Sequence, residues 1–325
     1  MSHPSTLSRS VSELARHVAD GLGRTPRALS SKYFYDDAGS RLFQHIMALP
    51  EYYPTRTEFA IFREHGAAIA AALRPAAVGA FSLVELGAGD GAKSKLLLAE
   101  LLAADPSFTY APVDISAGAM SGLVAALARE LPGLAVAPVV ADYATALGQL
   151  RTRPGGKAVL FLGSNIGNFQ PAERLDFLRQ LAAPLGPADR LLIGFDLRKD
   201  PRRIRAAYDD AQGVTAAFNL NLLTRLNREL GADFDLAHWQ HYTDYHPLSG
   251  AVRSYLVSGR AQAVRVAALD ETFAFAAWEV IHTENSYKFT RPQIEEMAAA
   301  AGLRVVAAFT DDAVDFADVV LAAAG

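Results

Sequence analysis

The chain has 325 residues, of which 51% are hydrophobic and 20% are charged, which is enough to bury the core of one large domain or of two ordinary ones. It has no cysteine and a formal net charge of -4, which excludes a disulfide scaffold and cysteine-ligated metal sites and argues against nucleic acid as a partner. We therefore expect a globular protein that acts on a small molecule.

The sequence also lacks the segments that direct a chain into or across a membrane. No run of about 18 consecutive apolar residues occurs. The beginning, "MSHPSTLSRSVSELARHVADGLG", has neither the basic start nor the apolar block of a signal peptide. We expect a cytoplasmic monomer with no membrane partner.

The first sixty residues have a helical pattern and are rich in aromatic residues. The stretch "SKYFYDDAGSRLFQHIMALPEYYPTRTE" contains Tyr33, Phe34, Tyr35, Tyr52 and Tyr53. A single aromatic residue most often packs in a core. Five of them around a polar loop also suggest the wall of a binding pocket.

From about residue 61, short apolar runs alternate with longer helical stretches. The predicted strands are 81–87, 109–116, 133–142, 157–165 and 190–197, and a helical stretch follows each of the first four. This order is typical of a doubly wound α/β fold, in which helices cover both faces of a parallel sheet.

After residue 197 the alternation stops. The sequence predicts a helix pair up to about residue 235, then a β-rich segment with period-two alternation, then one helix and two strand-like runs that form an antiparallel pair at the end of the sheet. We interpret the β-rich segment as part of a second, α+β domain. The predicted division is 61–196 plus 288–325 for the sheet domain, and 1–60 plus 197–287 for the second domain.

The strongest motif is "LVELGAGDGAKSK", which places Glu85, Gly87, Gly89 and Gly91 between a strand and a helix. Glycines allow a tight turn and a close approach to a ligand, and the helix start offers free N–H groups. The turn also satisfies the dinucleotide pattern G-x-G-x-x-A, so NAD is an alternative. Glu85 directly before the first glycine suits a cofactor with an ammonium and a sulfonium group better than a pyrophosphate.

Two further features bear on the cofactor. Asp114 ends the second strand, where it can accept ribose hydroxyl groups of either cofactor, and Asp142 ends the third, where it can accept from an adenine amino group. Either residue could instead be a helix cap or turn residue. The antiparallel pair at the end of the sheet is typical of class I methyltransferases. Together these features favour S-adenosylmethionine.

One other motif carries potential ligands. "HWQHYTDYH" contains His238, His241 and His246, but a metal site needs side chains that converge on one point and usually a carboxylate. We expect no metal.

Several stretches together resemble the bacterial L-histidine Nα-methyltransferases of ergothioneine biosynthesis, the EgtD family. They occur in the family's order from about residue 30 to the end of the chain, and they are "KYFYDDAGSRLFQHI", "LPEYYPTRTE", "ELGAGDGAKS", "FLGSNIGNF", "LNRELGADFD" and "HTENSYKF". The glycine turn alone is a weak signal, whereas "LPEYYPTRTE" together with "GSNIGNF" is specific.

The resemblance implies a Rossmann-like, class I methyltransferase domain and a second, substrate-binding α+β domain, with the amino acid held between them. The implied reaction is threefold methyl transfer from S-adenosylmethionine, as co-substrate, to the α-amino nitrogen of histidine, which gives hercynine. The resemblance assigns Gly87, Lys93, Asp114 and Asp142 to the cofactor. The glycine motif itself adds Glu85 and Gly89.

The resemblance also assigns residues to the substrate. Those at its amino and carboxylate end or around its ring are Tyr35, Tyr52, Gly163, Asn168 and Tyr208, and those at the imidazole are Glu284 and Ser286. Methyl transfer needs a neutral amine aimed at the methyl group, so most of the catalysis should be positioning. We expect Asn168 and Tyr35 to do this. Asn168 suits the task because its side-chain amide offers both a donor and an acceptor. No residue is identified as a general base.

Some alternatives stay open. The adjacent Tyr53 competes with Tyr52 as the pocket tyrosine. Ser254 and Asn165 stand where the family commonly has methionine and threonine, so another amino acid, such as tryptophan or a tryptophan derivative, is an alternative substrate. Glu284 with Ser286 favours histidine, because an imidazole has two ring nitrogens to satisfy and an indole has one N–H.

Overall fold

The computed structural model describes residues 4–75, 79–105 and 107–324. They form two compact units, which we call the mixed unit (Met1–Tyr53 and Lys199–Ser286) and the sheet unit (Pro54–Arg198 and Tyr287–Gly325). Residues 54–60 were expected in the substrate-binding domain but belong to the sheet unit. The reason is that they begin helix α3 (Tyr53–Leu73), whose buried Ile61 and Phe62 pack in the core of the sheet.

The sheet unit contains, among the described residues, an eight-stranded sheet in the order β13-β14-β7-β6-β2-β3-β4, with β5 also paired to β3. The strands are β2 (Phe81–Leu86), β3 (Phe108–Asp114), β4 (Ala135–Val136), β5 (Val139–Val140), β6 (Gly156–Phe161), β7 (Arg190–Asp196), β13 (Leu303–Thr310) and β14 (Phe316–Ala323). Strands β2 to β7 pair in parallel, whereas β14 is antiparallel to β7 and β13. The predicted parallel sheet and its antiparallel end are both present.

One predicted strand, 133–142, is two short strands in the structure. Pro138 lies between β4 and β5, and proline has no N–H to donate to a sheet ladder. The pairing with β3 is therefore interrupted at this position, and each half keeps only two paired residues.

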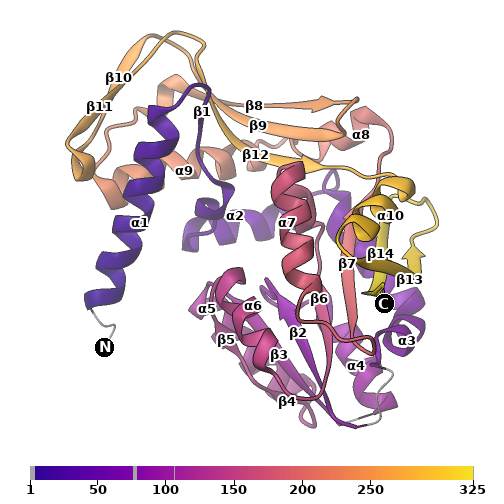
Figure 1. Ribbon diagram of the computed structural model, residues 1–325. Helices are drawn as coiled ribbons and strands as arrows, with labels where there is room; N and C mark the ends of the chain where they lie inside the picture. The colour runs from indigo at the N-terminus through magenta and orange to yellow at the C-terminus, as the bar shows by residue number, and fades with distance from the viewer. Residues whose placement is uncertain (1–3, 76–78, 106, 325) are drawn as a thin grey trace. The chain divides into compact units, whose positions relative to one another are not determined.

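Helices cover both faces of the sheet (Figure 1). On one face, α3, α4 (Ser94–Ala104) and α5 (Ala117–Glu130) share a buried core with the strands. On the other face, α6 (Tyr143–Thr152), α7 (Pro171–Ala182) and α10 (Arg291–Ala300) do the same. The strands are apolar on both faces because both faces are buried. The carboxyl ends of the parallel strands and the loops after them are left to form a site.

The mixed unit is built on a four-stranded sheet in the order β1-β12-β9-β8 and a separate β10-β11 pair. The strands are β1 (Arg27–Ala28), β8 (Trp239–His246), β9 (Ala251–Ser258), β10 (Gln262–Val266), β11 (Glu271–Phe275) and β12 (Val280–Tyr287). The helices are α1 (Pro4–Gly23), α2 (Asp37–Ala48), α8 (Pro201–Ala206) and α9 (Val214–Leu230), and short 3-10 turns are η1 (Ser31–Phe34), η3 (Leu236–His238) and η4 (Ala267–Leu269). In Figure 1, β8, β9 and β12 run side by side.

A single apolar core joins these elements of the mixed unit. Leucines along one side of α9 pack with residues of α1, α2 and the sheet strands. The helix ends at Gly231, which has a φ of 59°. Glycine adopts this left-handed conformation readily and is therefore common at helix ends. This packing fixes α9 and β12 with respect to each other.

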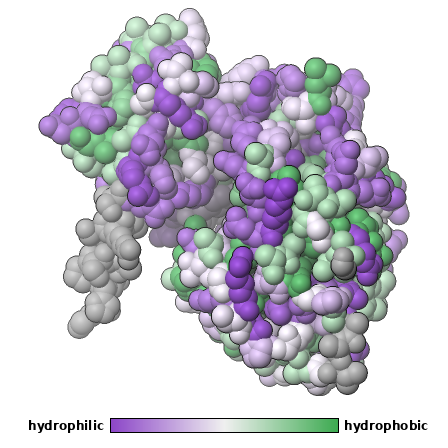
Figure 2. Space-filling view, viewed as in Figure 1, coloured by the Kyte–Doolittle hydropathy of each residue, from purple (hydrophilic) through white to green (hydrophobic). Residues whose placement is uncertain are grey.

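The visible surface of the molecule mixes hydrophilic and hydrophobic residues (Figure 2). No helix within the described ranges is both long enough and apolar enough to cross a membrane.

Candidate functional site

The glycine turn follows β2 at the carboxyl edge of the sheet. Gly87 has a φ of 74°, a conformation that residues with a Cβ rarely adopt. A Cβ at this position would also lie 2.8 Å from the hydroxyl oxygen of Tyr143. Both the backbone conformation and the available space therefore require glycine.

Asp114 and Asp142 lie at the ends of strands beside this turn. Asp114 Oδ2 accepts the N–H of Gly89 at 3.0 Å, and its Oδ1 accepts the N–H of Ser116 at 2.8 Å. Asp142 caps helix α6 by accepting the N–H of Thr145 at 2.8 Å. A carboxylate oxygen can accept more than one hydrogen bond, so these bonds do not exhaust either residue. The bonds tie Asp114 directly to the glycine turn.

Two exposed apolar side chains flank these carboxylates. Ile115, directly after Asp114, is 57% exposed, and Val140, two residues before Asp142, is 56% exposed. Exposed apolar residues next to carboxylates fit a ligand that combines a flat apolar ring with hydroxyl or amino groups. The adenosine part of S-adenosylmethionine has this chemistry, so the residues present fit the cofactor.

Glu85 lies deeper than we expected. Its carboxylate is buried and accepts hydrogen bonds from the hydroxyl groups of Ser94 and Tyr110, each at 2.5 Å. Burial raises the pKa of Glu85 to about 7. Glu85 is therefore bonded to the start of α4 and to β3, which corrects the expectation that its charge faces the cationic groups of the cofactor.

Lys93 is bonded within the protein, as we did not expect. It lies at the start of α4, and its ammonium group pairs with Glu58 of helix α3, whose carboxylate is fully buried. The other oxygen of Glu58 accepts the N–H of Gly163 at 2.9 Å. An ammonium group has three donors, so Lys93 can still donate to a ligand carboxylate. Glu58 is the last residue of "LPEYYPTRTE", and the sequence analysis gave it no role.

The loop after β6 carries the predicted substrate residues Gly163 and Asn168. Gly163 has a φ of 74° and Ser164 a φ of 60°, so the chain turns sharply as it leaves the strand. The turn η2 (Asn165–Asn168) follows, and Asn168, at its end, is partly exposed. The amide nitrogen of Asn165 lies 3.8 Å and 3.9 Å from where Cβ atoms at Gly87 and Gly163 would be. The structure thus brings this loop against the glycine turn.

Arg174 of helix α7 holds the far side of the same loop. The guanidinium donates to the carbonyl oxygens of Ile166 at 3.2 Å and Phe169 at 2.9 Å, and it lies between the rings of Tyr287 and Phe289. Burial lowers the pKa of Arg174 to about 10, so the group is charged at neutral pH. The sequence analysis missed this residue, because an arginine in a helix is usually a surface charge.

In the mixed unit, Tyr208 and Ser286 meet. Their hydroxyl oxygens are 2.8 Å apart and hydrogen-bonded. The ring of Tyr52 packs edge-on against Tyr208 with centroids 6.3 Å apart, whereas Tyr53 is fully buried beneath Lys199 and Arg203. Tyr52 is therefore the tyrosine that lies with the predicted substrate residues.

Tyr35 belongs to the same aromatic group. Its ring contacts Phe43 and Phe218, each with centroids 5.6 Å apart, and Phe43 in turn contacts Tyr52. Tyr35 is 37% exposed. Tyr35, Phe43, Tyr52 and Tyr208 thus form a continuous row of rings. The other residues predicted for the pocket wall, Tyr33, Phe34 and Tyr53, are instead buried.

Glu284 and Ser286 point to the same side of β12, because successive side chains of a strand alternate between its two faces. Ser286 is buried and Glu284 is partly exposed. Ser254 lies on the neighbouring strand β9, where it is buried, and its carbonyl oxygen accepts from Thr283 at 3.0 Å.

His241 holds the backbone of Tyr208 in place. The amide nitrogen of Asn219 lies 2.8 Å from His241 Nδ1 and also donates to the carbonyl oxygen of Tyr255 at 3.1 Å. Because an amide N–H donates, Nδ1 accepts and the proton lies on Nε2. The Nε2–H group then donates to the carbonyl oxygen of Tyr208 at 3.0 Å. Burial keeps the pKa of His241 below its ordinary value, which favours this neutral form.

The other two histidines of "HWQHYTDYH" have separate partners. His238 lies 3.4 Å from the Asp235 carboxylate, and His246 lies 3.0 Å from the hydroxyl of Ser249. Over the ranges that the structure describes, no group of three or more histidine, aspartate or glutamate side chains could hold a metal ion.

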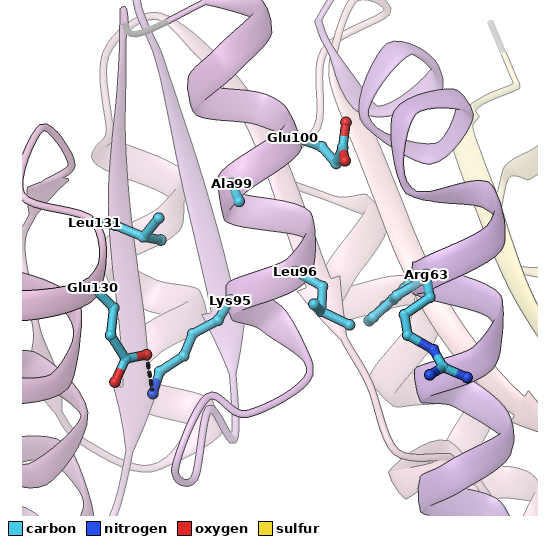
Figure 3. Close-up of a pocket in the computed structure, with 8 residues that line it drawn as sticks. Arg63, Lys95, Leu96, Ala99, Glu100, Glu130 and Leu131 are labelled. Atoms are coloured by element: carbon cyan, nitrogen blue, oxygen red, sulfur yellow. Dashed lines mark ion pairs between the residues drawn. The ribbon is translucent and has the colours of Figure 1, made fainter.

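A surface pocket elsewhere on the sheet unit is not the candidate site. It has a volume of about 370 Å³ and is lined by residues of α3, α4 and α5 and by the residue after α5, namely Phe62, Arg63, Lys95, Leu96, Ala99, Glu100, Glu130 and Leu131. Lys95 and Glu130 form an ion pair at 2.9 Å along one side, with Arg63 on the opposite side (Figure 3). None of the residues that the sequence analysis assigned to a ligand lines this pocket.

Comparison with known proteins shows the family of the chain. Residues 14–323 match the family described as "Histidine-specific methyltransferase, SAM-dependent". The chain is 45% identical over 303 residues to the histidine N-alpha-methyltransferase of Mycolicibacterium smegmatis, and this alignment covers 93% of the chain and 92% of that protein.

Two further relatives show how similarity varies with the named substrate. The histidine N-alpha-methyltransferase of Mycobacterium tuberculosis is 42% identical over 93% of the chain and 92% of that protein. The L-tryptophan methyltransferase of Psilocybe serbica is 28% identical over 90% of the chain and 88% of that protein. The chain belongs to the family of histidine-specific, S-adenosylmethionine-dependent methyltransferases.

Proposed function

We propose that this protein transfers three methyl groups from S-adenosylmethionine to the α-amino nitrogen of L-histidine and so produces hercynine for ergothioneine biosynthesis. The observation that carries the proposal is the hydroxyl pair of Tyr208 and Ser286 on β12, with Glu284 on the same side of that strand. The bacterial relatives named histidine N-alpha-methyltransferases support it.

Glu284 and Ser286 match the two nitrogens of an imidazole. A carboxylate accepts the ring N–H, and a hydroxyl can donate to or accept from the other nitrogen. An indole has one N–H and no second ring nitrogen, so it would use only part of this polar pair. The pair therefore supports histidine over tryptophan.

S-adenosylmethionine supplies an electrophilic methyl group when bound. Gly87 and Gly89 would lie against it, Asp114 would accept from its ribose hydroxyl groups, and Asp142 from its adenine amino group. Lys93 would donate to its carboxylate. Glu85 would act through Ser94 and the turn above it rather than by direct contact.

The substrate residues would act by orientation. Gly163, Asn168, Tyr52 and Tyr208 would hold the amino acid end of the substrate, and Tyr35 with Asn168 would aim the amine. The nitrogen attacks as a neutral amine, so that an N–C bond forms while the S–C bond breaks. The amine must release a proton before each transfer, and we assign it to solvent, since no side chain is identified as its acceptor. Orientation of this kind contributes up to about 7–11 kcal/mol to a barrier.

A product assay tests the proposal. The protein is incubated with S-adenosylmethionine and, in separate reactions, each of the proteinogenic amino acids, and the products are weighed by mass spectrometry. We expect histidine to gain three methyl groups. Methylation of another amino acid but not of histidine would refute the substrate. NADH binding without any methylation would refute the cofactor.

A further inference from the structure

Glu58 is a fully buried acid, and a glycine of the sheet unit leaves space for its carboxylate. It lies on α3, and its carboxylate reaches β7 at Gly194. A Cβ at Gly194 would lie 2.7 Å from Glu58 Oε1 and 3.0 Å from the ring of Phe316. The absence of a side chain at position 194 is therefore what lets the Glu58 carboxylate lie against the sheet.

The two oxygens of Glu58 serve two different segments. Oε1 accepts the N–H of Gly163, where the loop to Asn168 begins, and Oε2 pairs with Lys93, where α4 begins after the glycine turn. Hydrogen bonds to a charged acceptor are stronger than those between neutral groups, and burial strengthens them further. One carboxylate thus holds both the proposed cofactor segment and the proposed substrate loop.

Asp318 of β14 completes the cluster. It is fully buried, and neither of its oxygens has a hydrogen bond of ordinary geometry to any residue that the structure describes. Burial and the negative charge of Glu58 raise the pKa of Asp318 well above its ordinary value. Lys93 pairs with Glu58, so Glu58 rather than Asp318 is the acid that an ammonium group balances.

We propose that Glu58 is a positioning residue for methyl transfer, which sets the Gly163–Asn168 loop and the start of α4 in one fixed arrangement. This inference rests on the proposed function, because Asn168 and Lys93 take their ligand roles from it. The opposing explanation is that Glu58 only neutralises Lys93. In that case its loss would weaken cofactor binding and leave the substrate loop and the rate at saturating cofactor unchanged.

The test compares Glu58→Gln with two other variants. Glu58→Gln keeps the size and an acceptor for Gly163 but removes the charge, and Gly194→Ala displaces the carboxylate without changing any charge. Asp318→Asn is the matched control, since it replaces the neighbouring buried acid, whose oxygens bond neither Gly163 nor Lys93, by an amide of similar size. For each variant we would measure thermal unfolding, kcat and KM for histidine at saturating S-adenosylmethionine, and hydrogen–deuterium exchange of residues 160–170.

We expect Glu58→Gln and Gly194→Ala to lower kcat at saturating cofactor by about 10- to 100-fold, because small displacements of a reacting group have effects of that size. We also expect faster exchange in residues 160–170. Asp318→Asn should stay within about twofold of wild type. An unchanged kcat in a folded Glu58→Gln variant, or an equal loss in Asp318→Asn, would overturn the inference. If the wild type does not methylate histidine, the proposed function fails, and the exchange of residues 160–170 still decides whether Glu58 holds the loop.

Discussion

The two units hold their proposed ligand residues with opposite kinds of polar network. In the sheet unit, buried ions are central: Glu58 pairs with Lys93, and Lys288 pairs with Asp196 at the end of β7. In the mixed unit, Tyr208 is held by a hydroxyl on one side and by the neutral imidazole of His241 on the other.

This difference has energetic consequences. A buried ion that loses its partner destabilises a protein by about 3–5 kcal/mol, because the remaining charge is uncompensated. A buried neutral group that loses a hydrogen bond has a smaller effect, about 1–3 kcal/mol. Changes in the sheet-unit network should therefore appear first in stability, and changes in the mixed-unit network should appear first in histidine binding.

The largest effect should follow from breaking the pair of Lys288 and Asp196. Lys288 Nζ lies 2.8 Å from Asp196 Oδ2, and both side chains are buried. Lys288→Met should lower the free energy of unfolding by about 3–5 kcal/mol, and adding Asp196→Leu should recover most of it. Urea denaturation at pH 7 measures both. Arg202→Met, which breaks the exposed pair with Asp200, is the control and should change little. A small loss in Lys288→Met would show that ion burial is not what separates the two networks.

Glu85 predicts a pH dependence of stability in the sheet unit. Its pKa is raised from 4.5 to about 7 in the folded state, so folding favours the protonated form. This contribution is fully present below pH 4.5 and is lost as the pH rises through 7, by roughly 3 kcal/mol at most. Glu85→Gln is neutral at all pH values and should be more stable than wild type at pH 8 but not at pH 4. Chemical denaturation at the two pH values tests this, and an equal difference at both would contradict it.

Glu284 tests the ligand side of the comparison. Glu284→Ala should raise the Kd of histidine by about 10- to 100-fold, through the loss of a hydrogen bond to a charged acceptor. Binding of S-adenosylmethionine should be nearly unchanged. Isothermal titration with each ligand measures the two affinities. Glu271→Ala, at an exposed position on β11, is the control. Equal loss of both affinities would show that Glu284 is structural.

His241 should give the smallest effect. His241→Phe removes the donor to the Tyr208 carbonyl and should raise KM for histidine up to about tenfold, while His241→Gln retains an N–H donor and should recover part of the loss. The effect should largely disappear in a Tyr208→Phe background, where the hydroxyl that His241 positions is already absent. Additive effects in that double variant would exclude action through Tyr208.

The same residue gives a pH test. The folded pKa of His241 lies below 6.5, so its contribution to stability is present above pH 6.5 and is lost as the pH falls through the folded pKa. Protonated Nδ1 would face the N–H donor of Asn219. The free energy of unfolding should therefore fall more steeply between pH 7 and pH 5 in wild type than in His241→Gln. Equal slopes would rule out His241 as the titrating group.

The repeating pattern of the sheet unit made its fold predictable. Buried parallel strands are continuous apolar runs, and the runs 157–165 and 190–197 could be recognised as strands for this reason. In the structure, β6 ends at Phe161 and β7 ends at Asp196, earlier than predicted. The error at 133–142 came from giving Pro138 too little weight. Most of the residues assigned to ligands lay in motifs of a known family, so their positions followed from the resemblance, whereas Asp114, Asp142 and Tyr208 lay outside the quoted motifs.

The supporting residues could not be predicted in the same way. Glu58 lies 105 residues from Gly163, and His241 lies 33 residues from Tyr208. No local pattern indicates which acid or histidine will meet which backbone group over such separations, because packing of several elements decides it. Glu85 shows the opposite failure: its position in the motif was plain, but its burial beside Ser94 and Tyr110 was not.

Gly194 and Glu58 constrain each other's replacement in evolution. Since its missing Cβ makes room for the Glu58 carboxylate, a larger residue at 194 could be accepted only together with a shorter or apolar residue at 58. Positions 58 and 194 should therefore covary among related sequences, and a lineage that lost the acid would be free to fill the space with a side chain on β7.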